Sequence, residues 1–189
     1  MARGAEEAFR EFLGLGGDGA VFVCQGGAGF QFAMVAMNFA GPGGRCVYVN
    51  TGLWSTEAYK EAQICGAKPR LAASSEEDDF TYIPDVFDFD PEAKYIYLTT
   101  NNTVRGTQWQ HFPHNAPAPL VADMSSEFLS RPVDLEHFGL IYAGAQKNVG
   151  PAGVTVVAMR RDLADKARLD VPSMLSYPIY IKNDSMYNT

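Results

Sequence analysis

The stretch AVFVCQGGAGFQFAMVAMNFA, residues 20–40, carries the signals on which the fold assignment rests. Ala20–Cys24 is an unbroken apolar run bounded by glycine, which is typical of a strand buried on both faces of a sheet. The glycine-rich turn QGGAGFQ follows, and Phe32–Ala40 has helical apolar spacing and ends at the breaker GPGG. A buried strand that passes through a glycine turn into a helix indicates an α/β protein.

The same alternation continues along the chain. A second helix is predicted at Ser55–Cys65, with Ser55 as its cap and Gly66 as its stop, and a short helix is predicted at Glu6–Leu13. Further strands are predicted at Cys46–Val49, Pro69–Ala73, Lys94–Thr99, Pro119–Ala122, Leu140–Ala143 and Val154–Met159. This order predicts a three-layer αβα domain with a mainly parallel sheet covered on both faces. Pro172–Thr189 has no clear period and is expected to be an irregular extension that needs a surface to lie against.

Composition excludes several classes of protein. With 189 residues, 47% hydrophobic and 20% charged, the chain is an ordinary globular protein of one domain. A net charge of −7 argues against a nucleic-acid surface, because phosphate binding needs clustered lysine and arginine. The acidic run Ser74–Glu92 is expected to be a solvated loop, with an acidic surface for a partner as the alternative.

Cysteine usage and the apolar runs predict the compartment. Cys24, Cys46 and Cys65 are an odd number without CxxC spacing, which argues against a disulfide framework and a structural zinc site. They are expected to be small buried apolar side chains. The longest apolar run, Phe32–Met37, is too short to cross a bilayer, and no leader precedes it. A cytoplasmic protein with no membrane partner is therefore expected.

Polar residues follow the predicted strands at the edge where ligands bind in parallel sheets. They are the turn QGGAG, Thr51 and Trp54, Asn101–Thr103, Asp123 with Ser125 and Ser126, and Gln146–Lys147. A glycine turn at the start of a helix can bind phosphate through free backbone N–H groups. QGGAG matches neither GxGxxG nor GxxxxGK[ST], so a plain tight turn is the alternative.

Three side chains of this set could act together on a ring. Lys147 lies between an apolar strand and a Gly-Pro turn, so a partly buried lysine with a lowered pKa is expected, which would make it an amine nucleophile. Asp123 could pair with a buried cationic nitrogen, and Trp54 could stack on a planar ring. The alternatives are a lysine whose head reaches solvent, a helix-capping aspartate and a core tryptophan. Together with a phosphate turn, these groups are what a pyridoxal phosphate site requires.

Five segments carry a resemblance to a known family. They are QGGAGFQFAMVAMNF, VNTGLWSTEAYKEA, NNTVRGTQW, PLVADMSSEFLSRPVDLEHFGLIYAGAQKNVGPAGVTVV and NDSMYNT. In this order they resemble the phosphoserine aminotransferase family, a class V branch of the fold-type I pyridoxal phosphate enzymes. The resemblance runs from about Glu6 to Thr189 and implies a pyridoxal 5′-phosphate cofactor and the fold-type I large domain.

The resemblance also implies a role for each matching residue. Lys147 matches the lysine that bonds to the cofactor and moves a proton, Asp123 matches the partner of the pyridine nitrogen, and Trp54 matches the stacking ring. The remaining matches are Thr103 to the hydroxyl on the phenolic oxygen, Ala28 and Gly29 to the phosphate turn, and Gln146 to a further phosphate ligand. Asn188 and Thr189 match a pair that reaches the phosphate of the neighbouring subunit, which implies a homodimer with a shared site.

The sequence departs from the family in two respects. The turn reads Gly29-Phe30, and relatives commonly have a hydroxyl or an arginine at one of these two positions, so some phosphate affinity is expected to be lost or supplied differently. The family grips its substrate with Arg and His residues from an amino-terminal segment and a small carboxy-terminal domain. Residues 1–189 are expected to form the large domain without either of these. The arginines at 45, 70, 105 and 131 do not match the family's carboxylate clamp.

The resemblance implies transfer of an amino group from glutamate to 3-phosphohydroxypyruvate, giving phosphoserine and 2-oxoglutarate in serine biosynthesis. One alternative is another class V enzyme, of the alanine–glyoxylate aminotransferase or cysteine desulfurase type. The other is a truncated remnant that binds the cofactor weakly or not at all and has no turnover. His111 and His114 have HxxH spacing, with a metal pair as the alternative to a polar loop, and His137 is expected to be a surface or packing residue.

Overall fold

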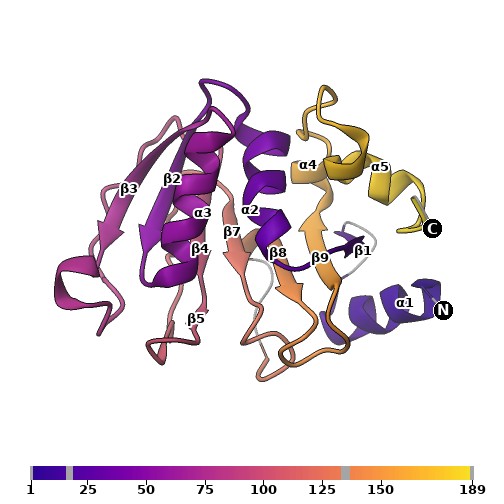
Figure 1. The fold of residues 1–189 in the computed structure, drawn as a ribbon, viewed down its shortest axis with the longest axis horizontal. Coiled ribbons are helices and arrows are strands. Elements are labelled where there is room, and N and C mark those ends of the chain that lie inside the picture. The colour runs from indigo at the N-terminus through magenta and orange to yellow at the C-terminus, as the bar shows by residue number, and fades with distance from the viewer. Residues whose placement is uncertain (1, 16–18, 133–136, 188–189) are drawn as a thin grey trace.

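The fold is built on one seven-stranded sheet, seen in a computed structural model that describes residues 2–15, 19–132 and 137–187 (Figure 1). Its strands are β1 (Gly19–Gln25), β2 (Arg45–Asn50), β3 (Lys68–Ser74), β4 (Ile96–Thr99), β7 (Leu120–Asp123), β8 (Phe138–Gly144) and β9 (Val154–Arg160). They lie in the order β1-β9-β8-β7-β4-β2-β3, and β9 runs antiparallel to both of its neighbours while the other pairs are parallel. All seven predicted strands are confirmed, and so is the mainly parallel α/β architecture.

Helices cover one face of the sheet. They are α2 (Gly29–Val35), which continues as a π-helical turn over Ala36–Ala40, α3 (Leu53–Ile64), α4 (Arg161–Ala164) and α5 (Tyr177–Lys182). A further helix, α1 (Ala2–Phe12), packs with Phe9 against the core of the opposite face. α2 and α3 lie side by side in front of the central strands (Figure 1). The core beneath them contains a group of buried aromatic rings from neighbouring strands, including Tyr48, Tyr97 and Tyr142.

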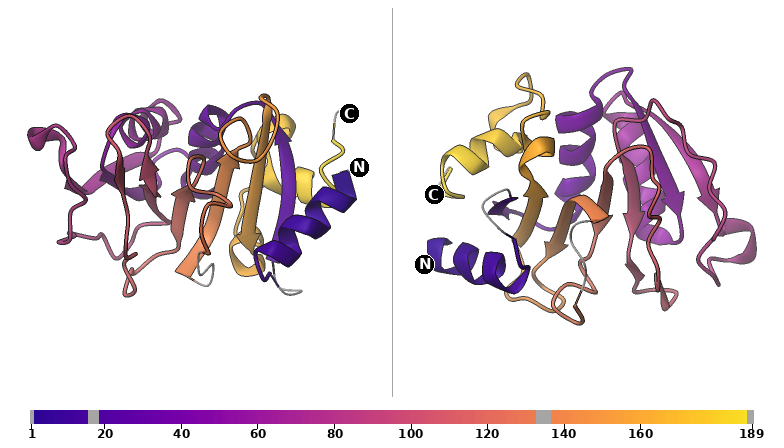
Figure 2. Two further views of the ribbon diagram at one scale, coloured as in Figure 1. Left: turned by 90° about the horizontal axis from the view of Figure 1, so that it is seen from below. Right: turned by 180° about the vertical axis from the view of Figure 1, so that it is seen from behind.

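The opposite face is covered mainly by irregular crossover segments. Figure 2, seen from behind, shows these segments passing over the strands, with α1 beside β1. A second core lies beneath them, in which Trp109 is buried and stacks on Phe87 and Phe112. A small hairpin, β5 (Asn101–Asn102) with β6 (Thr107–Gln108), projects beyond the end of β4.

Four of the eight acidic residues in the run after β3 pair with arginines of this chain. Arg45 contacts Asp90 at 2.6 Å, and its guanidinium holds the pKa of that carboxyl below its ordinary value. Arg70 likewise pairs with Asp88, and Arg105 donates to Asp79 at 2.7 Å. The run includes one 3-10 turn, η2 (Glu76–Asp78). These ion pairs attach the predicted solvated loop to the sheet edge and to the β5–β6 hairpin.

The prediction of an irregular carboxy-terminal extension is wrong for most of its length. The segment forms a 3-10 turn, η4 (Ser173–Leu175), and then α5, with Pro178 in the first turn of that helix. Tyr177 is fully buried, and its hydroxyl donates to the Gln31 side chain at 2.7 Å. Asn38 bonds to Leu175 and Tyr177 as well. The segment therefore lies against α2 of its own chain, and its aromatic side chains supply the apolar face that an aperiodic sequence concealed.

Two local predictions about α3 have different outcomes. Gly66 ends the helix in a left-handed conformation, as predicted, with φ +83°. Ser55 is not the cap residue, because the helix begins at Leu53 and Ser55 lies in its first turn. Its hydroxyl instead accepts the backbone N–H groups of Thr51 and Gly52, at 2.9 and 3.0 Å.

No helix in the described part of the chain is long and apolar enough to span a bilayer.

Candidate active site

A cavity of about 160 Å³ lies where the carboxyl ends of the parallel strands meet. Six of the predicted site residues line it: Ala28, Gly29, Trp54, Asp123, Gln146 and Lys147. Thr103 bonds to Lys147 from the adjacent hairpin. The predictions for Asn188 and Thr189 fall outside the described residues. Segments that are 120 residues apart in sequence thus converge on one cavity, as the strand-end pattern predicted.

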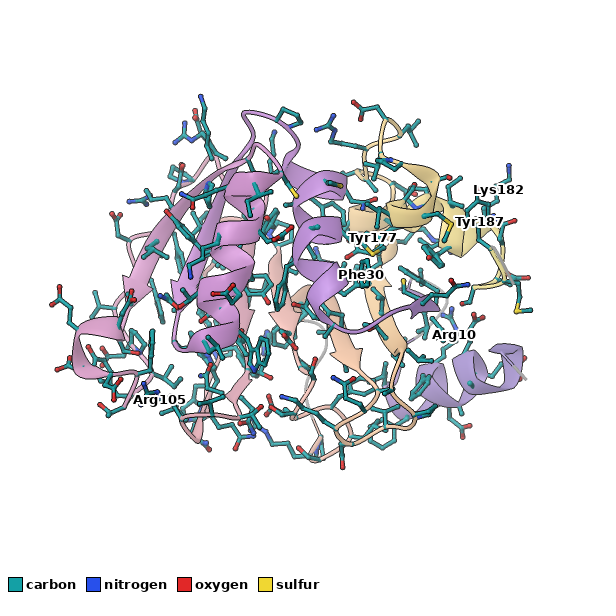
Figure 3. The ribbon with its side chains drawn as sticks, in the orientation of Figure 1. Arg10, Phe30, Arg105, Tyr177, Lys182 and Tyr187 are labelled. Atoms are coloured by element: carbon teal, nitrogen blue, oxygen red, sulfur yellow. The ribbon has the colours of Figure 1, made fainter. Side chains whose placement is uncertain are left out.

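The glycine turn after β1 is shaped by Gly26. Its φ of +95° is unfavourable for residues with a side chain, and an added Cβ would stand 2.7 Å from the Phe30 ring. Phe30 therefore folds back over this glycine, and more than half of its surface stays exposed. Figure 3 shows Phe30 at the start of α2. The turn brings Gly27, Ala28 and Gly29 to the cavity wall at the start of α2, where backbone N–H groups have no partner within the helix.

Hydrogen bonds at the start of α3 position Trp54. The Asn50 side chain at the end of β2 accepts the hydroxyls of Ser55 and Thr56, both at 2.9 Å. An added Cβ at Gly52 would stand 2.7 Å from the Asn102 side-chain oxygen, so the glycine lets the β5–β6 hairpin approach the helix. The indole of Trp54, more than a third exposed, then forms a flat wall of the cavity.

Lys147 lies at the mouth of the cavity. Its Nζ donates to the Thr103 hydroxyl at 2.5 Å and stands 5.9 Å from the centre of the Trp54 ring. The prediction of a partly buried lysine is wrong, because this side chain is exposed. The residue lies in the turn between β8 and β9, where the backbone N–H groups of Val149 and Gly150 donate to the Ala145 carbonyl.

Asp123 forms the floor of the cavity at the end of β7 and is only 5% exposed. Its Oδ1 accepts both the backbone N–H and the hydroxyl of Ser125, at 2.9 and 2.6 Å. Burial raises the pKa of Asp123 above its ordinary value, although the Ser125 bonds and the positive charge of Lys147 oppose this rise. A buried carboxylate in this state gains stability when a cation is placed beside it.

Gln146 reaches the cavity because Gly144 has no side chain. A Cβ added at Gly144 would stand 2.8 Å from the Gln146 side-chain oxygen and 3.1 Å from Cβ of Ala28. The backbone N–H of Gly144 also donates to the Ser125 hydroxyl at 3.0 Å. This glycine thus lets the phosphate turn, Gln146 and the Asp123 loop pack together.

The arginines noted in the sequence do not line the cavity. Arg45, Arg70 and Arg105 pair with carboxylates of the acidic run, and Arg131 pairs with the buried Glu127. Figure 3 shows Arg105 near the acidic loop, on the side of the molecule opposite Lys182 and Tyr187. Among the described residues that line the cavity, Lys147 is the one cationic side chain.

Six more of the described residues line the cavity, and the sequence analysis assigned none of them an individual role. Gly27, Asn101, Ser125 and Ser126 belong to the strand-end set named above, whereas Phe32 and Thr99 do not. Asn101 and the two serines follow strands, so the strand-end pattern contained the signal for them. Thr99 is the last residue of β4, and only the direction of its side chain, which a sequence does not give, distinguishes it from a core residue.

The histidines and cysteines give no support to the metal and thiol alternatives. His114 packs edge-on against His137, with ring centres 4.6 Å apart, and no cluster of three metal-binding side chains exists in the described ranges. Cys24 and Cys46 are buried as predicted, and burial raises the pKa of their thiols to about 12 and about 11. Cys65 is half-buried, at the end of α3 farther from the cavity, and burial raises its pKa too.

The arrangement defines the ligand chemistry. Backbone N–H groups at the start of α2 suit an anionic group such as phosphate, Trp54 suits a flat ring, and Asp123 suits a cationic ring nitrogen. The amine of Lys147 can attack an electrophilic carbon. Because all four lie on one cavity, a single flat anionic molecule could contact them together.

Comparison with known proteins gives a consistent set of relatives. The model of the aminotransferase class-V family matches residues 1–187. A phosphoserine aminotransferase from Desulfosudis oleivorans is 53% identical over 180 residues, 95% of this chain and 50% of that protein. One from Desulfatibacillum aliphaticivorans is 50% identical over 97% of this chain and 51% of its own length.

Solved structures agree with this result. Phosphoserine aminotransferase from Bacillus circulans subsp. alkalophilus has a TM-score of 0.93 and 45% identity, and the match covers this whole chain and 52% of that one. The pyridoxal phosphate-bound enzyme from Trichomonas vaginalis has a TM-score of 0.91 and 35% identity, over all of this chain and 57% of that one. The chain spans about half the length of the curated relatives it matches.

Proposed function

Because the chain belongs to the class-V aminotransferase family, we propose that its cavity binds pyridoxal 5′-phosphate and serves a phosphoserine transaminase. The reaction would interconvert 3-phosphohydroxypyruvate and glutamate with phosphoserine and 2-oxoglutarate. The observation that carries the proposal is the convergence of Lys147, Asp123, Trp54 and the glycine turn on one cavity. The relatives named phosphoserine aminotransferase support the choice of substrate.

The residues present fit this cofactor. Ala28 and Gly29 would hold its phosphate at the start of α2, with Gln146 beside them. Asp123, a buried carboxylate whose pKa is raised by desolvation, would hold the ring nitrogen in its protonated form. When bound, the cofactor supplies an electron sink for charge that develops at the substrate's α-carbon.

The chain's own residues then have separate tasks. Trp54 orients the ring by stacking, and the Thr103 hydroxyl, already bonded to Lys147, is placed to bond an oxygen at the ring edge. The Lys147 amine would hold the cofactor through its aldehyde carbon, and its Nζ would take and return the proton at the substrate's α-carbon. Because few waters reach the buried Asp123, its carboxylate would interact strongly with a protonated ring nitrogen placed beside it.

Substrate binding is the weakest part of the site in this chain. Both substrates carry several negative charges, and Lys147 is the cation that the described lining offers them. The arginines at 45, 70, 105 and 131 are paired with carboxylates of this chain. We therefore expect the reaction of this chain with glutamate to be slow, because lost contacts to remote substrate groups lower turnover as well as affinity. The paired arginines favour one second candidate, a chain that binds the cofactor without turnover.

A homodimer with a shared site and a cytoplasmic location are further parts of the proposal. Three large apolar side chains that directly follow or precede Gly29, Trp54 and Thr103 are exposed, namely Phe30 (57%), Leu53 (47%) and Val104 (64%), and a second copy would cover them. Removal of Asn188 and Thr189 should weaken cofactor retention if they reach the neighbouring phosphate, whereas unchanged retention would argue for a self-contained site. The three free thiols suit a reducing compartment.

The experiment mixes the purified protein with pyridoxal phosphate and records its visible spectrum. A band that borohydride bleaches and that Lys147→Ala abolishes would support the proposal. Lys166→Ala is the matched control, because this exposed lysine lies only near Asp162 on α4, at 3.9 Å, and should leave the band unchanged. Absence of the band in the unaltered protein, or its persistence in Lys147→Ala, would refute the proposal. Glutamate is then added to the banded protein, and fast conversion would rule out the candidate without turnover.

A further inference from the structure

Ser125 follows Asp123 by two residues, in the loop after β7, and lines the same cavity. It is a buried residue, 7% exposed. Its backbone N–H and its hydroxyl both donate to Oδ1 of Asp123, at 2.9 and 2.6 Å. The same hydroxyl accepts the backbone N–H of Gly144 at 3.0 Å. Ser125 therefore joins the end of β7 to the end of β8, the two strands that Asp123 ends and Lys147 follows.

The direction of these three hydrogen bonds follows from the two backbone donors. The N–H of Gly144 can only donate, so the Ser125 hydroxyl oxygen accepts there. A serine hydroxyl has a single proton, and that proton is left for Oδ1 of Asp123. The backbone N–H of Ser125 can likewise only donate. Oδ1 of Asp123 is thus the acceptor in both of its bonds to Ser125, whether the carboxyl is ionised or protonated.

The two carboxylate oxygens of Asp123 consequently have different roles. Each oxygen of a carboxylate has two lone pairs, and those of Oδ1 are engaged by the two donors of Ser125. A proton on the carboxyl must therefore reside on Oδ2, and a cationic donor in the cavity must also be met by Oδ2. Hydrogen bonds to an ionised oxygen are stronger than those between neutral groups, so Ser125 favours the ionised carboxylate against the effect of burial.

We propose that Ser125 is a positioning residue that acts through Asp123: it holds Oδ1 with two hydrogen bonds and thereby leaves Oδ2, ionised, for a cationic ring nitrogen in the cavity. The inference rests on the proposed function, since Asp123 is taken to meet a ring nitrogen. The effect of Ser125 on Asp123 is a property of the chain without cofactor, so it can be tested separately.

Asp123 also interacts with titratable side chains on neighbouring elements. Lys147 acts on it from the turn after β8, and the phenols of Tyr97 on β4 and Tyr142 on β8 act on it within the sheet. Burial raises the pKa of both phenols well above its ordinary value, so both stay neutral from acid to neutral pH. α2 (Gly29–Val35) has no ionisable side chain. Removal of the Ser125 hydroxyl replaces none of these groups, so a shift in the titration of Asp123 is attributable to the lost bond.

The first experiment uses the protein without cofactor and the substitution Ser125→Ala. The difference in unfolding free energy between a protein and its Asp123→Asn partner is measured against pH. The pH above which this difference stops changing reports the pKa of Asp123 in the fold. In the Ser125→Ala background this pH should rise by about one unit or more, as expected for one lost bond to an ionised acceptor. The Gly144 N–H loses its acceptor in both members of the Ser125→Ala pair, so its cost cancels.

Ser126→Ala is the matched control. Ser126 is the next residue and lines the same cavity, but its hydroxyl donates to the Asn101 carbonyl at 2.9 Å and not to Asp123. This substitution should leave the titration of Asp123 in place. Ser125→Thr keeps a hydroxyl on the same carbon and should restore most of the shift. An unmoved titration in Ser125→Ala, or an equal movement in Ser126→Ala, would overturn the proposal.

The second experiment measures the dissociation constant of pyridoxal phosphate against pH. The pH at which affinity falls off on the acid side should rise in Ser125→Ala and stay in place in Ser126→Ala. If the unaltered protein forms the Lys147-dependent band and Ser125→Ala moves neither profile, the role of Ser125 is refuted and the proposed function stands. If no band forms, the proposed function fails, and the measurement without cofactor alone decides whether Ser125 keeps Asp123 ionised.

Discussion

Replacing Asp123 by Asn should stabilise the protein without cofactor while weakening its hold on the cofactor. The carboxylate is 5% exposed and keeps both Ser125 bonds on Oδ1, an oxygen that an asparagine also provides. What the substitution removes is the charge, which burial penalises. The two effects have opposite signs because the charge costs stability until a cation lies beside it.

The dependence on pH follows from the raised pKa of Asp123. At a pH below 3.8, the ordinary pKa of an aspartate, Asp123 is protonated in both the folded and the unfolded chain, so its burial costs no charge energy. The folded chain holds the proton to a higher pH, so the cost grows as pH rises and is complete above the folded-state pKa. Each pH unit between the two values is about 1.4 kcal/mol. From the usual cost of burying a polar group that is only partly compensated, we expect a gain of about 1–3 kcal/mol for Asp123→Asn at neutral pH, or about 2–12 °C in Tm for a chain of this size.

Urea unfolding of the cofactor-free protein from acid to neutral pH measures this gain, and titration with pyridoxal phosphate measures the lost affinity. Asp162→Asn is a control of opposite sign, since Arg160 holds the pKa of that exposed carboxyl below its ordinary value. It should destabilise slightly at neutral pH, by less than about 1 kcal/mol. A cofactor-free Asp123→Asn protein that is less stable than its parent at neutral pH would refute the reasoning, and so would a gain that persists at pH 3.

Tyr177→Phe should cost about 1–3 kcal/mol, read as a lower urea midpoint, because it leaves the buried Gln31 carbonyl oxygen without the 2.7 Å bond. An unchanged midpoint would mean that the carboxy-terminal segment is not docked on α2 in solution. Gly26→Ala should reduce phosphate and cofactor affinity, since its φ of +95° and the Phe30 ring 2.7 Å away both oppose a Cβ, and isothermal titration would show it. Trp54→Ala should weaken cofactor binding about tenfold or more with little change in Tm, because the indole is 38% exposed and contributes more to the cavity than to the core.

The strands were predictable because a parallel sheet buried on both faces requires continuous apolar runs. Phe138–Gly144 is buried at every position, and the sequence shows the run plainly. The carboxy-terminal segment was not predictable in the same way. Its aromatic residues Tyr177 and Tyr180 are anchors in the core, but α5 is too short for its spacing to establish a helical period.

The cavity was predictable from strand ends, whereas burial within it was not. Asp123 and Lys147 each follow a strand, which placed both at the same edge. An apolar run before a lysine indicates that the strand is buried. It does not indicate whether the loop after the strand buries or exposes the lysine amine. The contact between the hydroxyls of Tyr97 and Tyr142 was likewise hidden, because both residues look like ordinary core positions until the strand register brings them together.

Asp123 at the floor of the cavity is buried, whereas Lys147 at its mouth is exposed, and this difference has a consequence for assembly. Charge interactions at Asp123 act in a medium of low dielectric constant, while those at the exposed Lys147 are screened by water and salt. If a second copy covers the apolar side chains beside the mouth, as we propose, it also removes water from the amine and strengthens its bond to the cofactor. Cofactor affinity should then rise with protein concentration, in step with the dimer fraction from analytical ultracentrifugation. Leu53→Asp, placed at the exposed start of α3, should reduce both together, and a dissociation constant independent of protein concentration would contradict the coupling.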